Sequence, residues 1–449
     1  MGPFAIQRQW SSARHEEAEV AHTSAMLKII LGNETVTRNE DDWAQTVRDD
    51  VHLSAYPLAL WLASSWWRLR WEPIPTSKPS HSWRMSHEMG AVGYGYVWPR
   101  MLFASDGDSI HVWAVQTPPD SKSPVRYLAN LIVEIGAADF ERGIDDFVNA
   151  VIARLDVFNM RDSALNRLWK EVLAERRNEE SRADRRLEAL LGFDPDESPQ
   201  ALMQRLKCLI PRAGASAIGE VAAVCGSRDA ASTLTQITAL ADSGGLFGRT
   251  DPLFSDLARA VNVNVPGWQR GRALAHSARN RLGLNGHIVT DETLCGLIGI
   301  RVADAFDYPS RDSRMPLGMG IRDPDSRETK FVFRKRNRPG RRFEIARFLC
   351  DQAIADADDS WLPTTDEKTS RQRTQRSFAA EFLCPIEPLK DFLGGDFSTN
   401  AIDEAVEHFG VSSRAIETQL VNHHVLPSEI LVENASRFGF PYFAGDANL

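Results

Sequence analysis

The sequence lacks the features that mark exported, disulfide-stapled and membrane-spanning chains. Its five cysteines, spread over 449 residues, form no CxxC pair, so neither a disulfide framework nor a zinc knuckle is indicated. Residues 1–10 show no succession of basic, apolar and small residues, and we expect no signal peptide. The most apolar stretch, residues 55–69, is interrupted by Pro57 and Arg68 and is shorter than the roughly 20 residues that cross a bilayer. We therefore expect a cytoplasmic protein without a membrane partner.

An excess of positive charge is missing as well. The formal net charge is -9 at pH 7, which argues against nucleic-acid binding by the whole molecule but leaves room for one local basic surface. Apolar residues make up 43% of the chain and charged residues 25%, which is the balance of an ordinary globular protein. Because domains commonly have about 100–200 residues, we expect two or three separately packed units.

Tryptophan is concentrated near the N-terminus, where nine of the twelve tryptophans precede residue 114. Gly32-Asn33 within residues 25–37 and Asp106-Gly107 within residues 101–115 predict two hairpins. Ser54 is a candidate N-cap, and the apolar spacing of residues 140–158 predicts an amphipathic helix. We therefore predict an α+β domain of no recognised family over residues 1–158.

The middle of the chain is predicted to be helical. Within residues 159–250, the stretch from residue 162 to about residue 241 has helical periodicity almost throughout, with a break at Gly192-Phe193-Asp194-Pro195. We interpret this part as a helical spacer, followed by a third domain over residues 251–449.

Two small groups in the first domain are candidates for chemistry. One is His87, and the other consists of Asp106, Asp108 and His111 around the second hairpin. Neither matches a specific motif, because His87-Glu88 lacks a second histidine and turn geometry alone accounts for the aspartates. Surface and turn roles are the simpler interpretation, and an active site around His87, Asp106 and His111 is the alternative.

The third domain carries an ordered set of features. Residues 330–333 read as a strand, and a helix follows that begins with Arg342-Phe343 and continues with Glu344-Ile345-Ala346. Farther on comes Ser-Phe-Ala-Ala-Glu-Phe-Leu-Cys-Pro, at residues 377–385, and then closing helices around residues 405–420. This order resembles the ImmA/IrrE family of metallopeptidases over residues 256–430. The resemblance implies a zincin-like α+β fold here, so we expect the whole chain to be a multidomain α+β protein.

The zinc chemistry of that family is absent from these residues. The resemblance implies His-Glu-x-x-His, in which two imidazoles one turn apart bind zinc and the glutamate takes a proton from the bound water. Arg347, Phe348 and Asp351 occupy those three places, and Gln372 lies where a further acidic ligand is expected. No histidine lies between residues 287 and 408, so a shifted register does not restore the pair. We predict no catalytic residue, no metal and no cofactor.

Positive charge is concentrated around the same helix. The candidate anion-binding or nucleic-acid-binding residues are Arg334, Lys335, Arg336, Arg338, Arg341, Arg342, Arg371, Arg373 and Arg376. Amides at a helix start, combined with guanidinium groups, favour the binding of phosphate or another anion. The competing interpretation is a solvated, self-neutralising surface in which Arg347 and its neighbours pair with nearby aspartates, namely Asp351, Asp356, Asp358 and Asp359.

These patterns predict a regulatory, sensor or scaffold protein whose metallopeptidase-like domain binds a protein partner without cleaving it. The resemblance adds a bacterial setting in phage defence, toxin-antitoxin pairs or the regulation of mobile elements. One alternative is a DNA-binding regulator that uses the arginine-rich groove or the helix-turn-helix pattern of residues 405–420 around Gly410. Another is an enzyme with its active site in the N-terminal domain.

Overall fold

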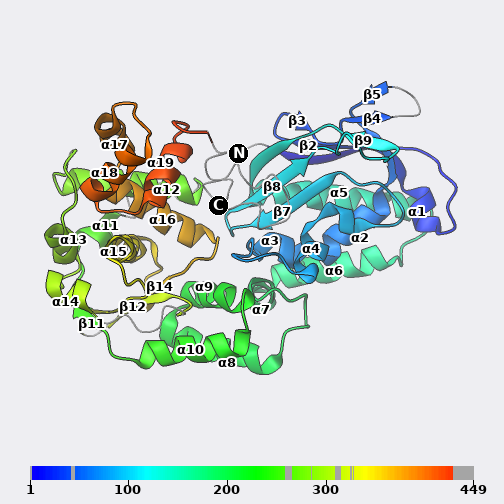
Figure 1. Cartoon of the computed structure of the whole chain (residues 1–449). Helices are drawn as coiled ribbons and strands as arrows, with labels where there is room; N and C mark the ends of the chain where they lie inside the picture. Colours follow the sequence, from blue (N-terminus) through cyan, green and yellow to red (C-terminus); the bar gives the residue numbers. More distant parts are fainter. Residues whose placement is uncertain are drawn as a thin grey trace. The chain divides into compact units, whose positions relative to one another are not determined.

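The structure is a computed structural model that describes residues 3–41, 46–257, 265–284, 286–308, 315–323, 326 and 328–427. The chain divides into two compact units, Met1–Ile74 with Pro79–Ser198 and Pro75–Lys78 with Pro199–Leu449. Each unit contains sheets and helices (Figure 1), which confirms the predicted α+β class. The predicted boundaries at residues 158 and 250 do not coincide with this division, because the helices of the predicted spacer are shared between the two units.

The first unit contains antiparallel sheets joined by short turns. In one of them, β2 (Ser24–Leu31) pairs with β1 (Phe4–Trp10), β3 (Glu34–Thr35) and β6 (Val51–Ser54). Another has the order β10-β8-β7, formed by Leu131–Gly136, Ser109–Val115 and Arg100–Ser105. A smaller sheet joins β5 (Thr46–Arg48), β4 (Asn39–Asp41) and β9 (Val125–Tyr127). Both predicted hairpins are confirmed, as β2-β3 and β7-β8.

Helices cover these sheets. They are α1 (Ala18–His22), α2 (Ala55–Ser64), α3 (Trp66–Trp71), α4 (His81–His87), the 3-10 helix η1 (Met89–Val92), α5 (Ala137–Val157), α6 (Ala164–Arg177) and α7 (Glu179–Leu190). The predicted start of α2 after Ser54 is confirmed, but the cap differs. The Ser54 hydroxyl donates to the carbonyl of Val20 at 2.9 Å, and Thr23 Oγ1 accepts from the amide of Tyr56 at 3.2 Å. Thr23, which lies far away in the sequence, therefore satisfies the helix start.

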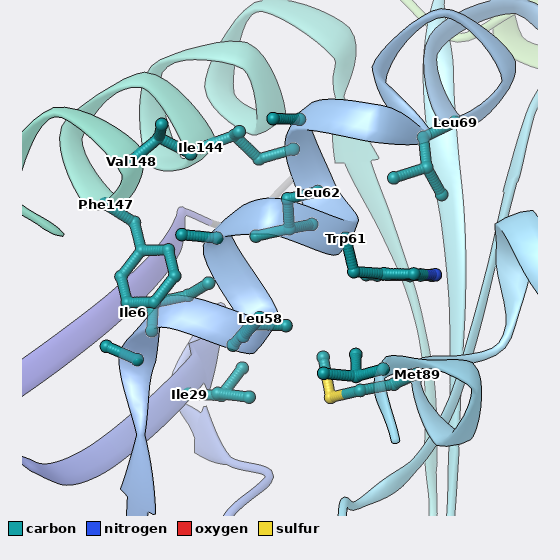
Figure 2. Packing of buried hydrophobic residues seen from close by; sticks show 14 of the residues in the cluster. Ile6, Ile29, Leu58, Trp61, Leu62, Leu69, Met89, Ile144, Phe147 and Val148 are labelled. Atoms are coloured by element: carbon teal, nitrogen blue, oxygen red, sulfur yellow. The ribbon is translucent and has the colours of Figure 1, made fainter. Parts of the chain in front are cut away.

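The core of the first unit lies around α2 (Figure 2). Leu58, Trp61 and Leu62 of α2 are buried among apolar side chains of β1, β2 and α5. Alternation along β1 sends Phe4 and Ile6 inward, while α5 buries one apolar stripe, as predicted for residues 140–158. Because burying one such side chain contributes about 1.5–3 kcal/mol, this cluster is the main source of stability in the unit.

The second unit is built on the antiparallel sheet β11-β13-β12-β14, formed by Leu246–Gly248, Thr329–Val332, Gly318–Arg322 and Trp361–Thr364. Its helices are α8 (Gln200–Ala213), α9 (Ala215–Gly226), α10 (Ala230–Asp242), α11 (Leu253–Leu257), α12 (Gly267–Arg281), α13 (Asp291–Leu297), α14 (Val302–Asp307), α15 (Arg338–Ile354), α16 (Ser370–Leu383), α17 (Ile386–Leu393), α18 (Thr399–Phe409) and α19 (Ser413–Asn422). Helix α16 packs against both α12 and α15. Glycine permits the close approach to α12, since a Cβ atom at Gly271 would lie 2.4 Å from the carbonyl oxygen of Thr374.

Helix α15 begins earlier than predicted. The strand predicted at residues 330–333 is confirmed as β13, but the chain is already helical from Arg338 and not from Arg342. The reason is local, because the Asn337 side chain accepts from the amide of Gly340 at 2.7 Å and Pro339 lies in the first turn.

The predicted turn at Gly410 is confirmed by its left-handed φ of 63° between α18 and α19. In the part of the chain that the structure describes, no helix is both long and apolar enough to cross a membrane.

Candidate functional site

Three positions on α15 correspond to the expected His-Glu-x-x-His residues, and Phe348 is the most apolar of them. Its ring is fully buried and lies 5.4 Å from the ring of Phe331 and 5.9 Å from that of Phe333. The position that would carry a general base therefore contributes to the hydrophobic core.

Arg347 and Gln372, which were predicted to replace two zinc ligands, are hydrogen-bonded to each other. Nη2 of Arg347 donates to Oε1 of Gln372 and, at 2.7 Å, to the carbonyl of Thr365. Its Nε donates to Oε1 of Gln375 at 3.2 Å. The Gln372 amide is oriented in turn by the amide of Thr365 and the carbonyl of Pro363. Burial lowers the pKa of Arg347 to about 10, so this buried guanidinium stays charged at neutral pH.

Asp351, at the third position, is fully engaged by Arg371 of α16. Nε and Nη2 of Arg371 donate to the two oxygens of Asp351 at 2.8 and 2.9 Å, and Nη1 donates to Asp359 at 2.6 Å. Burial disfavours the charge of Arg371, but the charges of Asp351 and Asp359 outweigh it and raise its pKa. A bidentate pair of this kind uses both carboxylate oxygens, so each oxygen of Asp351 already accepts a hydrogen bond from Arg371.

The alternative interpretation of the basic run was that nearby aspartates neutralise it. This pairing is found for Asp351 and Asp359. Asp351 and Asp359 do pair with an arginine, but the arginine is Arg371 and the pairs are buried inside the unit. Asp356 and Asp358 are exposed. The predicted solvated surface is therefore wrong for Asp351 and Asp359, because α16 and α9 enclose them.

Several of the remaining candidate cations donate to internal acceptors. Arg334 forms a bidentate pair with Asp366 at 2.7 and 2.8 Å. Arg341 donates to the carbonyls of Lys335 and Ala305. Arg342 donates to the carbonyls of Gly410 and Val289 and pairs with Asp291, which also pairs with the exposed Arg338. These arginines fasten the start of α15 to neighbouring segments.

A second group of cations lies around the first turns of α16. We define this cationic cluster as Arg347, Lys368, Arg373 and Arg376. Nη1 of Arg376 donates to the carbonyl of Glu367 at 2.9 Å, while its Nη2 is buried without a hydrogen-bond partner among the described residues. Burial, followed by the charge of Arg347, lowers the pKa of Arg376 to about 9. Burial, followed by the charges of Arg376 and Arg414, lowers the pKa of Lys368 to about 7. The carboxylates of Asp366 and Glu220 counteract part of this effect on Arg376.

Two candidates remain, Lys335 and Arg336. Arg336 is exposed, and the Lys335 side chain is partly buried. Burial and the charge of Arg334 lower the pKa of Lys335.

Helix α9, from the predicted spacer, is part of this polar centre. The amide of Ala217 donates to Oδ1 of Asp359 at 3.3 Å, and Thr369 donates to the buried Glu220 at 2.7 Å. The sequence interpretation missed both contacts. The available signal was Glu220 itself, the single charged residue within the mostly apolar run of residues 215–226.

Gly214 sets the distance between α9 and Asp359. Its φ is +98°, and a Cβ atom there would lie 2.1 Å from Oδ1 of Asp359. We expect Gly214→Ala to lower the free energy of unfolding by roughly 1–3 kcal/mol through strain and displacement of the carboxylate, as measured by urea unfolding. Gly395→Ala is the matched control, because Gly395 has a φ of +88° with no atom within 4 Å of the added Cβ. Equal losses in the two variants would contradict the contact argument.

In the first unit, the structure brings Asp106 and His111 together and leaves Asp108 and His87 elsewhere. Oδ2 of Asp106 lies 3.4 Å from Nε2 of His111, whereas Asp108 is exposed. His87 is buried in a different network, with Nδ1 2.9 Å from the carbonyl of Phe103 and Nε2 2.9 Å from Glu72. Glu134 joins Asp106 and His111, since one ligand atom from each of these three residues lies within 4.8 Å of the others. The sequence interpretation did not include Glu134.

No protein-family model, no curated protein and no solved structure matches this chain.

Proposed function

We propose that the second unit is an ImmA/IrrE-like domain with a zincin-like fold that has lost its zinc and acts as a non-catalytic binding domain. The whole chain would then be a regulatory, sensor or scaffold protein. One observation carries the proposal, namely the hydrogen bonding of Arg347 to Gln372 at positions assigned to two metal ligands.

A metal site on α15 would need a lone pair that Arg347 does not have. A zinc ligand must present a free lone pair toward the ion. A guanidinium has none, because all its nitrogens are donors. Both oxygens of Asp351, the carboxylate at the third of these positions on α15, accept from Arg371. In place of a metal, the fixed charge of Arg347 links α15 to α16 through neutral amides, which preserves their packing.

The setting follows from the resemblance. Domains of this family are associated with phage defence, toxin-antitoxin pairs and mobile-element regulation in bacteria, and we place the chain in this group with a protein as its partner.

A peptide-cleavage assay tests the loss of catalysis. The full-length chain is incubated with a defined peptide mixture and Zn²⁺ or Mn²⁺, and new termini are sought by mass spectrometry. We expect none. Metal-dependent cleavage that persists in Glu134→Gln but disappears in Asp351→Asn, when circular dichroism shows that both variants are folded, would place a working site on α15 and overturn the proposal.

A second function, anion or nucleic-acid binding, is favoured by the buried Nη2 of Arg376, which has no hydrogen-bond partner in the described ranges. Because Arg334, Arg341, Arg342 and Arg371 donate to internal acceptors, few guanidinium groups are left for a duplex. A small anion such as phosphate suits the cationic cluster better. Phosphate titration by calorimetry should give saturable binding that Arg376→Gln weakens, and equal binding by the variant would argue against this role.

A further inference from the structure

The sheet β10-β8-β7 of the first unit has two chemically different faces. Along β8, Ile110, Val112 and Ala114 belong to the hydrophobic core. Since strand side chains alternate, Ser109 and His111 lie on the other face. The register places Glu134 of β10 directly opposite His111, and Asp106 follows β7 in the hairpin turn.

We propose that Asp106, His111 and Glu134 bind one divalent transition-metal ion. The proposal goes beyond the function proposed above, because it concerns the other unit and a different chemistry.

The positions of the ligand atoms support this site. Bonds of about 2.1 Å to a shared ion place ligand atoms no more than about 4.2 Å apart. One nitrogen and two carboxylate oxygens of these residues lie within 4.8 Å of one another, and the Asp106–His111 pair is already at 3.4 Å. The ligand atoms are therefore close to the spacing that one shared ion requires.

Backbone contacts orient the Asp106 carboxylate. Its Oδ1 accepts from the amides of Asp108 and Ser109 at 2.9 and 2.7 Å. These two bonds fix the carboxylate plane and leave Oδ2 on the side of His111. Support of a metal ligand by surrounding hydrogen bonds is typical of protein metal sites.

Ser109 provides an independent observation. The residue is fully buried, and its Oγ has no hydrogen-bond partner among the described residues. It lies on the His111 face of β8, opposite Gly136 in the pairing of β8 with β10. A buried hydroxyl without a partner is unfavourable, and water bound to a metal at the neighbouring residues would supply the missing partner.

The ligand types select the kind of ion. One imidazole with two carboxylates suits Zn²⁺ or Mn²⁺, while Ca²⁺ and Mg²⁺ prefer oxygen alone. For such a mixed site, affinity should follow the general order of first-row divalent ions, with Zn²⁺ bound more tightly than Mn²⁺.

Calorimetric titration tests the proposal on the full-length chain, without an affinity tag and after removal of metals by a chelator. ZnCl₂ should bind with one ion per chain at this site. Glu134→Gln and His111→Gln should each raise the Kd at least tenfold. Asp108→Asn is the matched control, because Asp108 belongs to the same turn but is exposed, and it should bind as the wild type does.

X-ray absorption of the zinc-loaded wild type provides a readout that does not depend on any variant folding. We expect one imidazole and oxygen ligands around the zinc, with no sulfur. Two or more imidazoles, a sulfur ligand, the absence of a saturable site, or unchanged affinity in folded Glu134→Gln would each overturn the proposal. None of these results would bear on the peptidase-like unit, whose test is cleavage that depends on Asp351.

Discussion

Replacement of Arg371 by methionine is expected to lower the free energy of unfolding by about 3–5 kcal/mol, the usual cost of removing one partner from a buried ion pair. Arg371 pairs with both Asp351 and Asp359, whose side chains are 0% and 1% exposed. Without it, two buried carboxylates remain, and both lose the hydrogen bonds that Arg371 donates. The loss should appear in urea as a lower midpoint with an unchanged slope.

Two further variants separate the buried pair from a general effect of losing an arginine. Arg301→Met removes an arginine from an exposed pair with Asp304 and should leave the midpoint unchanged within error. Asp351→Leu combined with Arg371→Met should cost less than the sum of the single changes, because one buried charge is no longer left alone. If Arg371→Met lowers the free energy of unfolding by less than about 1 kcal/mol, water reaches Asp351 and Asp359 and the prediction is wrong.

The local elements of the fold were predictable because their signals are local. Gly32-Asn33 and Asp106-Gly107 are turn dipeptides, and the hairpins formed where they indicated. The cap of α2 was not predictable in this way, since Thr23 reaches the amide of Tyr56 from a separate segment. The start of α15 is a different case. Asn337 caps the helix, so it begins at Arg338. This signal is present in the sequence, but the surrounding basic residues drew attention away from it.

The candidate sites were predictable as residues but not as contacts. Arg347 and Gln372 were identified by position, yet the sequence did not reveal that one donates to the other. Glu134 was missed because only the pairing of β8 with β10 brings it opposite His111. Counting charges along the chain also failed to separate Arg371, which is buried and paired, from the exposed Arg336. Burial of a guanidinium depends on distant segments such as α9, and no local pattern encodes it.

In the first unit, Glu72→Gln is expected to lower the free energy of unfolding at neutral pH by about 3 kcal/mol, again the scale of breaking a buried charged pair. Glu72 accepts from Nε of Arg68 at 2.7 Å and lies 2.9 Å from Nε2 of His87. The residues are 7%, 2% and 0% exposed. The variant keeps the shape of the side chain but leaves the buried Arg68 without its nearest carboxylate.

The same variant should also remove a pH dependence. Burial alone would raise the pKa of Glu72, but the hydrogen bond and charge of His87 and the charge of Arg68 outweigh it and lower that pKa. A carboxyl with a lowered folded-state pKa stabilises the protein above its unfolded-state value, near pH 4.5, and this contribution is lost as pH falls through the folded value. The wild type should therefore lose stability in acid more steeply than Glu72→Gln.

A local spectroscopic signal connects this loss to the Glu72 network. The ring of Trp83 stacks on that of His87, with centroids 4.1 Å apart, so the near-ultraviolet circular dichroism of tryptophan should change as Glu72 is protonated. Glu88→Gln is the control, because Glu88 pairs with Arg84 nearer the surface and should contribute little. The prediction is wrong if the free energy of unfolding of Glu72→Gln depends on pH in the same way as that of the wild type. Another carboxyl would then be the source of the acid sensitivity.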